Sequence, residues 1–269
     1  ARAQADRAAV GHAPRIAHHV PPLFYPAWEI LPHEPKLPHA DVISERLETL
    51  IALTHQTSRL APPIITNVLA LLQRTFPAGE LTQRTRTLTR GTRIEPLDLV
   101  EWLEEQGYEP EAQVTTKGEL ALRGGILDVF PPTSPWPVRL EFFGDELESL
   151  REFDPLTQIS REEIPSFALP PAGELGILKQ RVAAQPETQH TFATLLDYLP
   201  ANALLLLCEP DQLEEHAANY ATQVPGGDPF FIPWADLRDQ AEQRGMTLLE
   251  LSDSFGAPVS DPASSWDSE

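Results

Sequence analysis

Apolar residues recur at helical spacing in the first eighty residues of the chain, where the segments alternate between helix and strand. Asp41 opens a stretch with apolar residues at positions typical of one helix face, namely Val42, Ile43, Leu47, Leu50 and Ile51. Short apolar runs at Leu23–Tyr25 and Ile64–Thr66 predict strands, and Asn67 caps a predicted helix over Val68–Arg74. This alternation predicts an α/β layer with a largely parallel sheet.

The pattern changes near Thr85, where strand-like runs begin to follow one another closely. Thr87–Arg93 alternates like a strand, and a helix is predicted from Pro96 to a stop at Gly107. Three further strand-like runs follow, at Glu119–Phe130, Val138–Phe143 and Glu148–Phe153. Consecutive strands with short connections and one helix predict an α+β domain with an antiparallel sheet.

The last third of the chain returns to mixed signals. It predicts a helix near His190–Tyr198, a buried strand at Ala203–Cys208 and a helix from Asp211 to about Tyr220, after which the signal weakens. Because the first and third segments share one character, we expect them to pack together as one domain that carries the middle segment as an insertion. The expected divisions are 1–85, 86–170, 171–251 and a disordered tail or linker at 252–269.

Composition limits the classes of protein that fit. No apolar run approaches the ~18 residues that a membrane span needs, no signal peptide is visible, and the first residue is Ala1, not Met, which favours a fragment. The single cysteine, Cys208, rules out an internal disulfide and fits a reducing cytoplasm, and its apolar neighbours predict a buried side chain.

Charge is unevenly spread along the chain, whose formal net charge is −20. Residues 1–100 carry 11 Lys and Arg against 9 Asp and Glu, whereas residues 101–269 carry 9 against 31. An acidic surface repels phosphate, so we expect no tight binding of nucleic acid by the second half. Plain solubility explains the same charge equally well.

Several kinds of catalytic or metal site lack their residues. A P-loop ends in Gly-Lys-Ser/Thr, and none of the three lysines follows a glycine. One cysteine and scattered histidines do not supply a zinc site, and there is no Gly-x-Ser-x-Gly elbow. Paired carboxylates remain open, since they arise by chance in an acidic chain. We therefore expect no cofactor, no metal and no catalytic residue in these 269 residues.

The most informative run extends from Gly118 to Arg151. It reads as a strand interrupted by Gly124-Gly125, a proline-rich loop and a returning strand. Alternation on the returning strand turns Val138, Leu140 and Phe142 to one face, and Arg139, Glu141 and Phe143 to the other. An exposed phenylalanine beside an arginine is typical of a protein-binding hot spot, and the glycines permit a bend that re-aims Arg123. The alternative is an ordinary solvated face with an Arg139–Glu141 ladder and a covered Phe143.

The spelling of this run resembles the UvrA-binding domain shared by UvrB and the transcription-repair coupling factors. The matching runs are Arg-Gly-Gly-Ile-Leu-Asp-Val-Phe-Pro from Arg123, Arg-Leu-Glu-Phe-Phe-Gly-Asp-Glu from Arg139 and Phe-Asp-Pro-Leu-Thr-Gln from Phe153. Pro-Ala-Trp-Glu-Ile-Leu-Pro from Pro26, Ser-Glu-Arg-Leu from Ser44 and Tyr-Leu-Pro-Ala-Asn from Tyr198 also fit the coupling factors. The resemblance covers about residues 20–220.

The resemblance implies a fold and a partner. It implies the amino-terminal, UvrB-homology region of a coupling factor, with a P-loop-NTPase-like parallel layer (UvrB domain 1-like) interrupted by an antiparallel domain (UvrB domain 2-like). In that family two arginines and a phenylalanine of this run contact UvrA, which implies roles for Arg123, Arg139 and Phe143. The resemblance also implies that other parts of the parent protein bind ATP, carry the translocase and contact RNA polymerase and DNA. It implies a cytoplasmic location.

Two other interpretations compete with a UvrA-binding module. UvrB itself is an excision-repair ATPase and needs a P-loop and an aromatic-rich hairpin, but the segment from Arg74 to Arg93 has one aromatic residue, Phe76. An unrelated acidic hydrolase or interaction protein would show a desolvated carboxylate or histidine cluster in a deep pocket.

Overall fold

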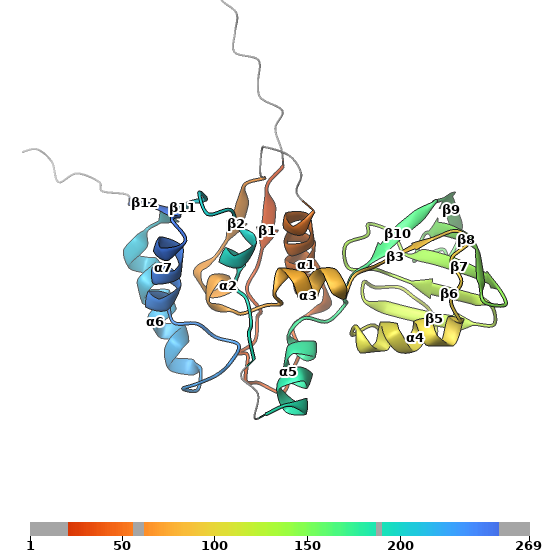
Figure 1. Ribbon diagram of the computed structural model, residues 1–269, viewed down its shortest axis with the longest axis horizontal. Helices are drawn as coiled ribbons and strands as arrows, with labels where there is room; N and C mark the ends of the chain where they lie inside the picture. Colours follow the sequence, from red (N-terminus) through yellow and green to blue (C-terminus); the bar gives the residue numbers. More distant parts are fainter. Residues whose placement is uncertain (1–20, 56–61, 187–189, 253–269) are drawn as a thin grey trace, which may run out of the picture.

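The computed structural model describes residues 21–55, 62–186 and 190–252. It is a mixed α/β structure in which two lobes lie side by side (Figure 1). One hydrophobic core is built from two separate parts of the chain, residues 25–81 and residues 175–246. The other core lies within residues 88–172. We call these the α/β lobe and the inserted lobe.

Two parallel pairs of strands form the sheets of the α/β lobe. One pair is β1 (Leu23–Tyr25) with β2 (Ile64–Thr66), and the other is β11 (Leu204–Cys208) with β12 (Thr247–Leu251). The largely parallel sheet expected from the sequence is therefore present as two separate two-stranded sheets.

Helices pack around these strands where the sequence supplies caps and apolar faces. The α-helices of this lobe are α1 (Ala40–Thr54), α2 (Val68–Leu72), α3 (Ala78–Gln83), α5 (Leu175–Ala184), α6 (Pro210–Gln223) and α7 (Trp234–Gln243). The Asn67 side chain accepts a hydrogen bond from the backbone N–H of Ala70, so the predicted cap of α2 is confirmed.

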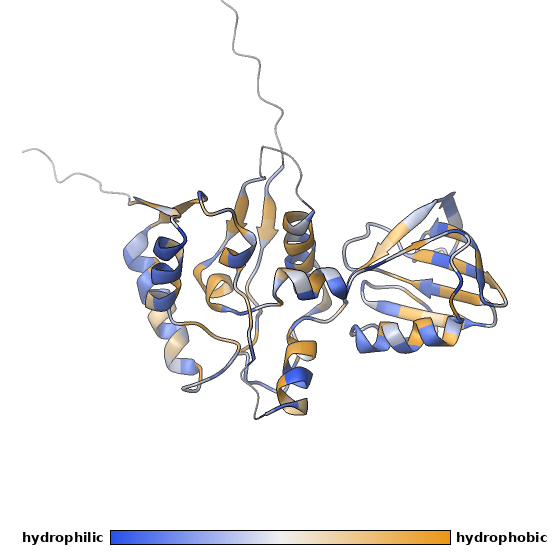
Figure 2. Ribbon diagram, in the orientation of Figure 1, coloured by the Kyte–Doolittle hydropathy of each residue, from blue (hydrophilic) through white to orange (hydrophobic). Residues whose placement is uncertain are grey.

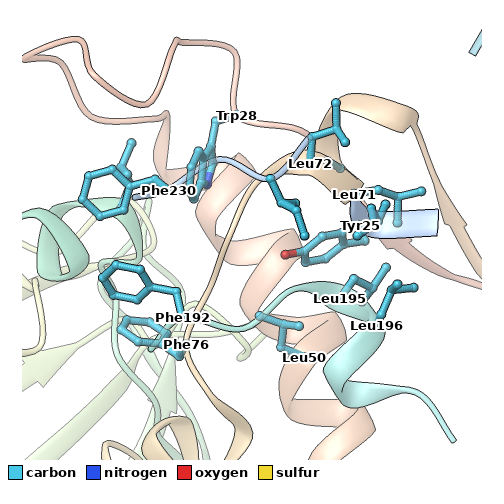
Figure 3. Close-up of a cluster of buried hydrophobic side chains, with 14 of the residues drawn as sticks. Tyr25, Trp28, Leu50, Leu71, Leu72, Phe76, Phe192, Leu195, Leu196 and Phe230 are labelled. Carbon is cyan, nitrogen blue, oxygen red and sulfur yellow. The ribbon is translucent and has the colours of Figure 1, made fainter. Parts of the chain in front are cut away.

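The core of the α/β lobe joins segments that lie far apart in sequence. Tyr25 and Leu50 from the first segment lie with Leu195 and Phe230 from the third (Figure 3). Burial of these side chains is the main force that holds the two segments together, because apolar area removed from water stabilises the fold.

The inserted lobe contains a sheet that is antiparallel except for its parallel β4–β5 pair, and a helix covers one face of it. Its six-stranded sheet has the order β4 (Glu109–Pro110), β5 (Glu119–Arg123), β6 (Ile126–Val129), β7 (Val138–Phe143), β8 (Glu146–Phe153) and β9 (Ser160–Glu163). Helix α4 (Pro96–Glu105) buries Leu99 and Leu103 against this sheet, and β3 (Arg86–Thr89) pairs with β10 (Ser166–Leu169). Figure 2 shows hydrophobic and hydrophilic bands alternating along these strands.

Turns in the inserted lobe divide two runs that the sequence pattern predicts to be continuous. Glu119–Phe130 is not one interrupted strand but the hairpin β5–β6, because Gly124 adopts a positive φ of 63° in a two-residue turn. The strand predicted at Thr87–Arg93 ends at Thr89, before a turn in which Gly91 has a φ of 84°. The predicted strand Val138–Phe143 is confirmed to the residue as β7.

Predictions for the third segment were less accurate. The helix expected near His190–Tyr198 is only a short 3-10 helix, η1 (Leu195–Tyr198), and α6 begins at Pro210 with Glu209 as its N-cap. Helix α7 and strand β12 were not predicted. Cys208 is exposed, so its predicted burial was wrong, because β11 turns one apolar face away from the core.

Apart from Ser252, the tail or linker expected at residues 252–269 lies outside the described residues. None of the helices formed by residues 21–55, 62–186 and 190–252 has the length and apolar character that a membrane span requires.

A close backbone contact fixes the place where the chain enters and leaves the inserted lobe. The carbonyl oxygen of Gln106 accepts hydrogen bonds from the backbone N–H groups of Ala172 and Gly173, at 2.8 and 3.0 Å. A Cβ atom at Gly107 would lie 2.7 Å from the Gly173 nitrogen, so this approach requires a glycine. The Arg84 guanidinium also donates to the Gln106 side chain at 3.0 Å.

Candidate partner-binding surface

Two hairpin turns of the inserted lobe lie at the same end of the sheet. The turn between β5 and β6 and the turn between β7 and β8 each have two residues between paired positions. The backbone N–H of Phe142 donates to the Gly125 carbonyl at 2.8 Å, which ties the two turns together. The pairing places Arg123, Ile126 and Glu141 opposite one another across three strands, so their side chains share one face.

Phe143 projects from this end of the sheet into solvent. It is the last residue of β7 and is 76% exposed, which is unusual for a phenylalanine. Strand alternation puts it on the same face as Glu141, opposite the face that packs on α4. Among the described residues no element covers Phe143, in contrast to the ordinary-face alternative raised from the sequence.

Arg123 and Arg139 converge on one buried carboxylate, that of Asp128 on β6. Arg139 donates through Nε to Oδ1 at 2.7 Å and through Nη2 to Oδ2 at 2.9 Å, and Arg123 donates through Nη2 to Oδ2 at 2.7 Å. The Asp128 side chain is 0% exposed, whereas the Arg139 side chain is 16% exposed and that of Arg123 is 50% exposed. The two arginines therefore differ sharply in how much surface they offer.

The loop after β8 explains why Arg139 is covered. This loop carries the run Phe153-Asp-Pro-Leu-Thr-Gln158 and places the Gln158 carbonyl 3.4 Å from Arg139 Nη1. The guanidinium also lies 4.6 Å from the centre of the Phe153 ring. Hydrogen bonding to Asp128 raises the pKa of Arg139 above its ordinary value, although burial acts in the opposite direction.

The Arg139–Glu141 ladder considered from the sequence is not formed. The Glu141 carboxylate accepts a hydrogen bond from Ser149 Oγ at 2.6 Å, and the ion partner of Arg139 is Asp128 on the neighbouring strand. Residues two apart on a strand share a face, but the residue directly opposite on the next strand lies closer.

Sequence reasoning missed two residues of this surface. Asp128 was overlooked although it is an acidic residue inside the apolar run from Ile126 to Phe130, a signal for a buried ionic partner. Ile126, 38% exposed, lies opposite both Arg123 and Glu141. Its exposure depends on the hairpin turn at Gly124-Gly125, where the sequence pattern predicts only a bend within one strand.

Comparison with known proteins places this surface in a known domain family. Residues 87–175 match the family described as the UvrB interaction domain. This segment of the chain is a UvrB interaction domain. This domain contains all three candidate residues, Arg123, Arg139 and Phe143, together with Asp128 and Ile126.

Much of the chain is also similar to parts of longer proteins. It is 41% identical over 148 residues, 55% of its length, to the transcription-repair-coupling factor of Escherichia coli (strain K12), and it covers 12% of that protein. It is 30% identical over 242 residues, 88% of its length, to the transcription-repair-coupling factor of Myxococcus xanthus, covering 19% of it. The resemblance to the coupling factors is confirmed, and the chain spans about an eighth to a fifth of these relatives.

Proposed function

We propose that this chain is the UvrA-binding module of a transcription-repair coupling factor. In this role it recruits UvrA to stalled RNA polymerase in transcription-coupled nucleotide excision repair, in the cytoplasm. The observation that carries the proposal is the exposed Phe143 beside the half-exposed Arg123, at one end of a UvrB interaction domain.

The surface offers an apolar anchor next to a charged one. Phe143 buries its ring against UvrA, since aromatic residues surrounded by excluded water dominate binding energies. Arg123 donates its remaining N–H groups to a carboxylate of UvrA, and Ile126 extends the apolar contact between them. In this proposal Arg139 belongs to the same surface but supports it from within.

The proposal assigns no catalysis to these residues. ATP-driven translocation and the contacts with DNA and RNA polymerase are assigned to other parts of a coupling factor. The α/β lobe corresponds to UvrB domain 1 as a P-loop-NTPase-like layer without a working P-loop. Its parts are residues 1–85 and 171–251, and the inserted domain is residues 86–170. The shared core of the first and third segments supports this division.

A calorimetric titration of the cognate UvrA tests the proposal. We expect the chain to bind and the Phe143→Ala variant to lose at least about 2 kcal/mol of binding free energy. Leu97→Ala is the matched control, because Leu97 is an exposed apolar residue on α4, which packs on the opposite face of the sheet. It should bind like the unchanged chain.

Two outcomes would contradict the proposal. The unchanged chain could fail to bind UvrA, in which case the surface has another partner. Alternatively, Phe143→Ala and Leu97→Ala could weaken binding equally, in which case this end of the sheet is not the contact.

A further inference from the structure

We propose that a positively charged cleft between the two lobes binds a small ligand that carries phosphate groups. The cleft has a volume of about 660 Å³, which lies within the range of small-molecule sites. Its lining includes Glu80, Arg84, Trp102, Gln106 and Arg181. None of these residues belongs to the surface proposed to bind UvrA, so this inference does not rest on the proposed function.

Helices of both lobes form the walls of the cleft. Glu80 lies on α3 and Arg84 is the C-cap of that helix, while Arg181 lies on α5, and both helices pack in the core of the α/β lobe. Trp102 lies on α4 of the inserted lobe, and Gln106 is its C-cap. Figure 1 shows α3 extending toward the inserted lobe. A ligand in the cleft therefore contacts both lobes, a common place for small-molecule sites.

One carboxylate holds two arginines at the wall of the cleft. Glu80 Oε1 accepts a hydrogen bond from Arg84 Nε at 3.0 Å, and Glu80 Oε2 accepts one from Arg181 Nη1 at 2.6 Å. The Arg84 and Arg181 side chains are 26% and 32% exposed, so both guanidinium groups reach solvent. Because a single carboxylate neutralises only one of them, a positive charge remains in excess.

Hydrogen-bond donors remain on both guanidinium groups. Arg84 Nη1 donates to Gln106 Oε1 at 3.0 Å, and Gln106 is only 4% exposed, so it fixes Arg84 from within the fold. Arg84 Nη2 has no partner among the described residues, and neither have Nε and Nη2 of Arg181. Planar guanidinium groups with spare donors match the oxygen atoms of a phosphate group.

A third arginine adds an unpaired charge beside the cleft. The guanidinium carbon of Arg86 lies 4.1 Å from the centre of the Trp102 ring. Within the part of the chain that the structure describes, no ion pair or side-chain hydrogen bond involves Arg86. Three arginines thus meet one glutamate in a chain whose net charge is −20. Positive charges gathered in a cleft attract anions.

The chemistry of the cleft favours a compact ligand, such as a diphosphate or a phosphate ester, over a nucleic acid. A compact group with two or more negative charges matches the excess positive charge and the spare donors. A polynucleotide would also approach the surrounding acidic surface, since residues 101–269 carry 31 Asp and Glu against 9 Lys and Arg. That surface repels a phosphate backbone.

Calorimetric titration of inorganic pyrophosphate into the 269-residue chain, at constant ionic strength, tests the proposal. We expect saturable binding at one site. Arg86→Gln and Arg181→Gln should each weaken it about tenfold, the effect of losing one hydrogen bond to a charged group. Arg90→Gln is the matched control, because Arg90 is an exposed arginine that pairs with Glu163 outside the cleft. It should bind like the unchanged chain.

A second measurement does not depend on the folding of a variant. Arginine side chains of the unchanged chain are modified with a phenylglyoxal reagent, with and without pyrophosphate, and the modified sites are located by mass spectrometry. We expect Arg86 to react in the free chain and to be protected by pyrophosphate. Arg90 should react equally in both states, and equal reaction of Arg86 in both states would contradict the proposal.

Three results of the titration would overturn the proposal. The first is the absence of saturable pyrophosphate binding. The second is equal weakening by Arg86→Gln and Arg90→Gln, which would show attraction to the total charge and not to the cleft. The third is tighter binding of a single-stranded oligonucleotide than of pyrophosphate, weakened by the same cleft variants, which would show that the cleft holds a polynucleotide.

Discussion

The two lobes each contain an arginine bound to a buried carboxylate, and the two pairs differ in what remains free. In the α/β lobe, Arg46 donates to Glu174 through Nε at 2.7 Å, and both side chains are fully buried. The remaining Arg46 donors reach the Pro26 carbonyl and the Tyr25 hydroxyl. In the UvrB interaction domain, Asp128 receives two arginines, one of which extends to the surface.

The two arginine–carboxylate clusters differ in how much of their charge reaches the surface. Arg46 is enclosed by the rings of Tyr25 and Trp28, at 4.2 and 4.7 Å, and its charge is matched by a single carboxylate. Such a pair joins α1 to the start of α5 and offers nothing to a partner. Around Asp128 one arginine is in excess, and the excess charge lies at the surface. The proposed function assigns the outward-facing donors of Arg123 to the partner, whereas the Arg46–Glu174 pair serves the fold.

The largest expected effect is on stability, from Arg46→Ala. Removing this arginine leaves the Glu174 carboxylate buried without its ion partner, which costs about 3–5 kcal/mol of unfolding free energy. Urea denaturation monitored by tryptophan fluorescence measures the loss. A loss of unfolding free energy below about 1 kcal/mol is typical of exposed ion pairs, and it would contradict the complete burial of Arg46 and Glu174.

A smaller effect distinguishes the two arginines of the UvrB interaction domain. Arg139→Met should lower the unfolding free energy by about 2 kcal/mol, because Asp128 loses its bidentate partner. Arg123→Met should lower it by less than about 1 kcal/mol, since Arg139 still compensates the carboxylate. The same denaturation experiment on both variants tests this, and equal losses would contradict the unequal roles of the two arginines.

The smallest effect concerns a phenol in the second core. Tyr108 donates from its hydroxyl to the Pro170 carbonyl at 2.9 Å, so Tyr108→Phe should cost about 1 kcal/mol at neutral pH. Burial raises the pKa of Tyr108 well above 10.0 in the folded state. The wild-type stability that depends on this proton is therefore present below pH 10.0 and is lost as the pH rises further, when the unfolded chain releases the proton.

The pH dependence gives this prediction its control. A phenylalanine has no phenolic proton, so the deficit of Tyr108→Phe should shrink as the pH rises past 10.0. Denaturation curves at neutral and alkaline pH measure the deficit for both proteins. A deficit that stays constant over this range would show that Tyr108 is not protonated preferentially in the folded state.

Elements with a strong local signal could be predicted from the sequence. Pro96 at a helix start and Asn67 at a cap act within one turn of helix, and both elements are present. The strand Val138–Phe143 follows from strict alternation. Helix α7 is missed because its apolar positions are sparse. Strand β12 is missed although three of its five residues are leucine, because its stability comes from pairing with the distant strand β11.

The sequence by itself identified the run that carries Arg123, Arg139 and Phe143 and its resemblance to a known domain. Only the tertiary structure decided which of these side chains are accessible. Asp128 meets Arg139 because β6 pairs with β7 in one particular register, and Arg139 is covered because the loop after β8 folds over it. The register between two strands and the covering of a side chain by a loop both depend on contacts between separate segments. The spacing of residues along a single strand does not specify these contacts.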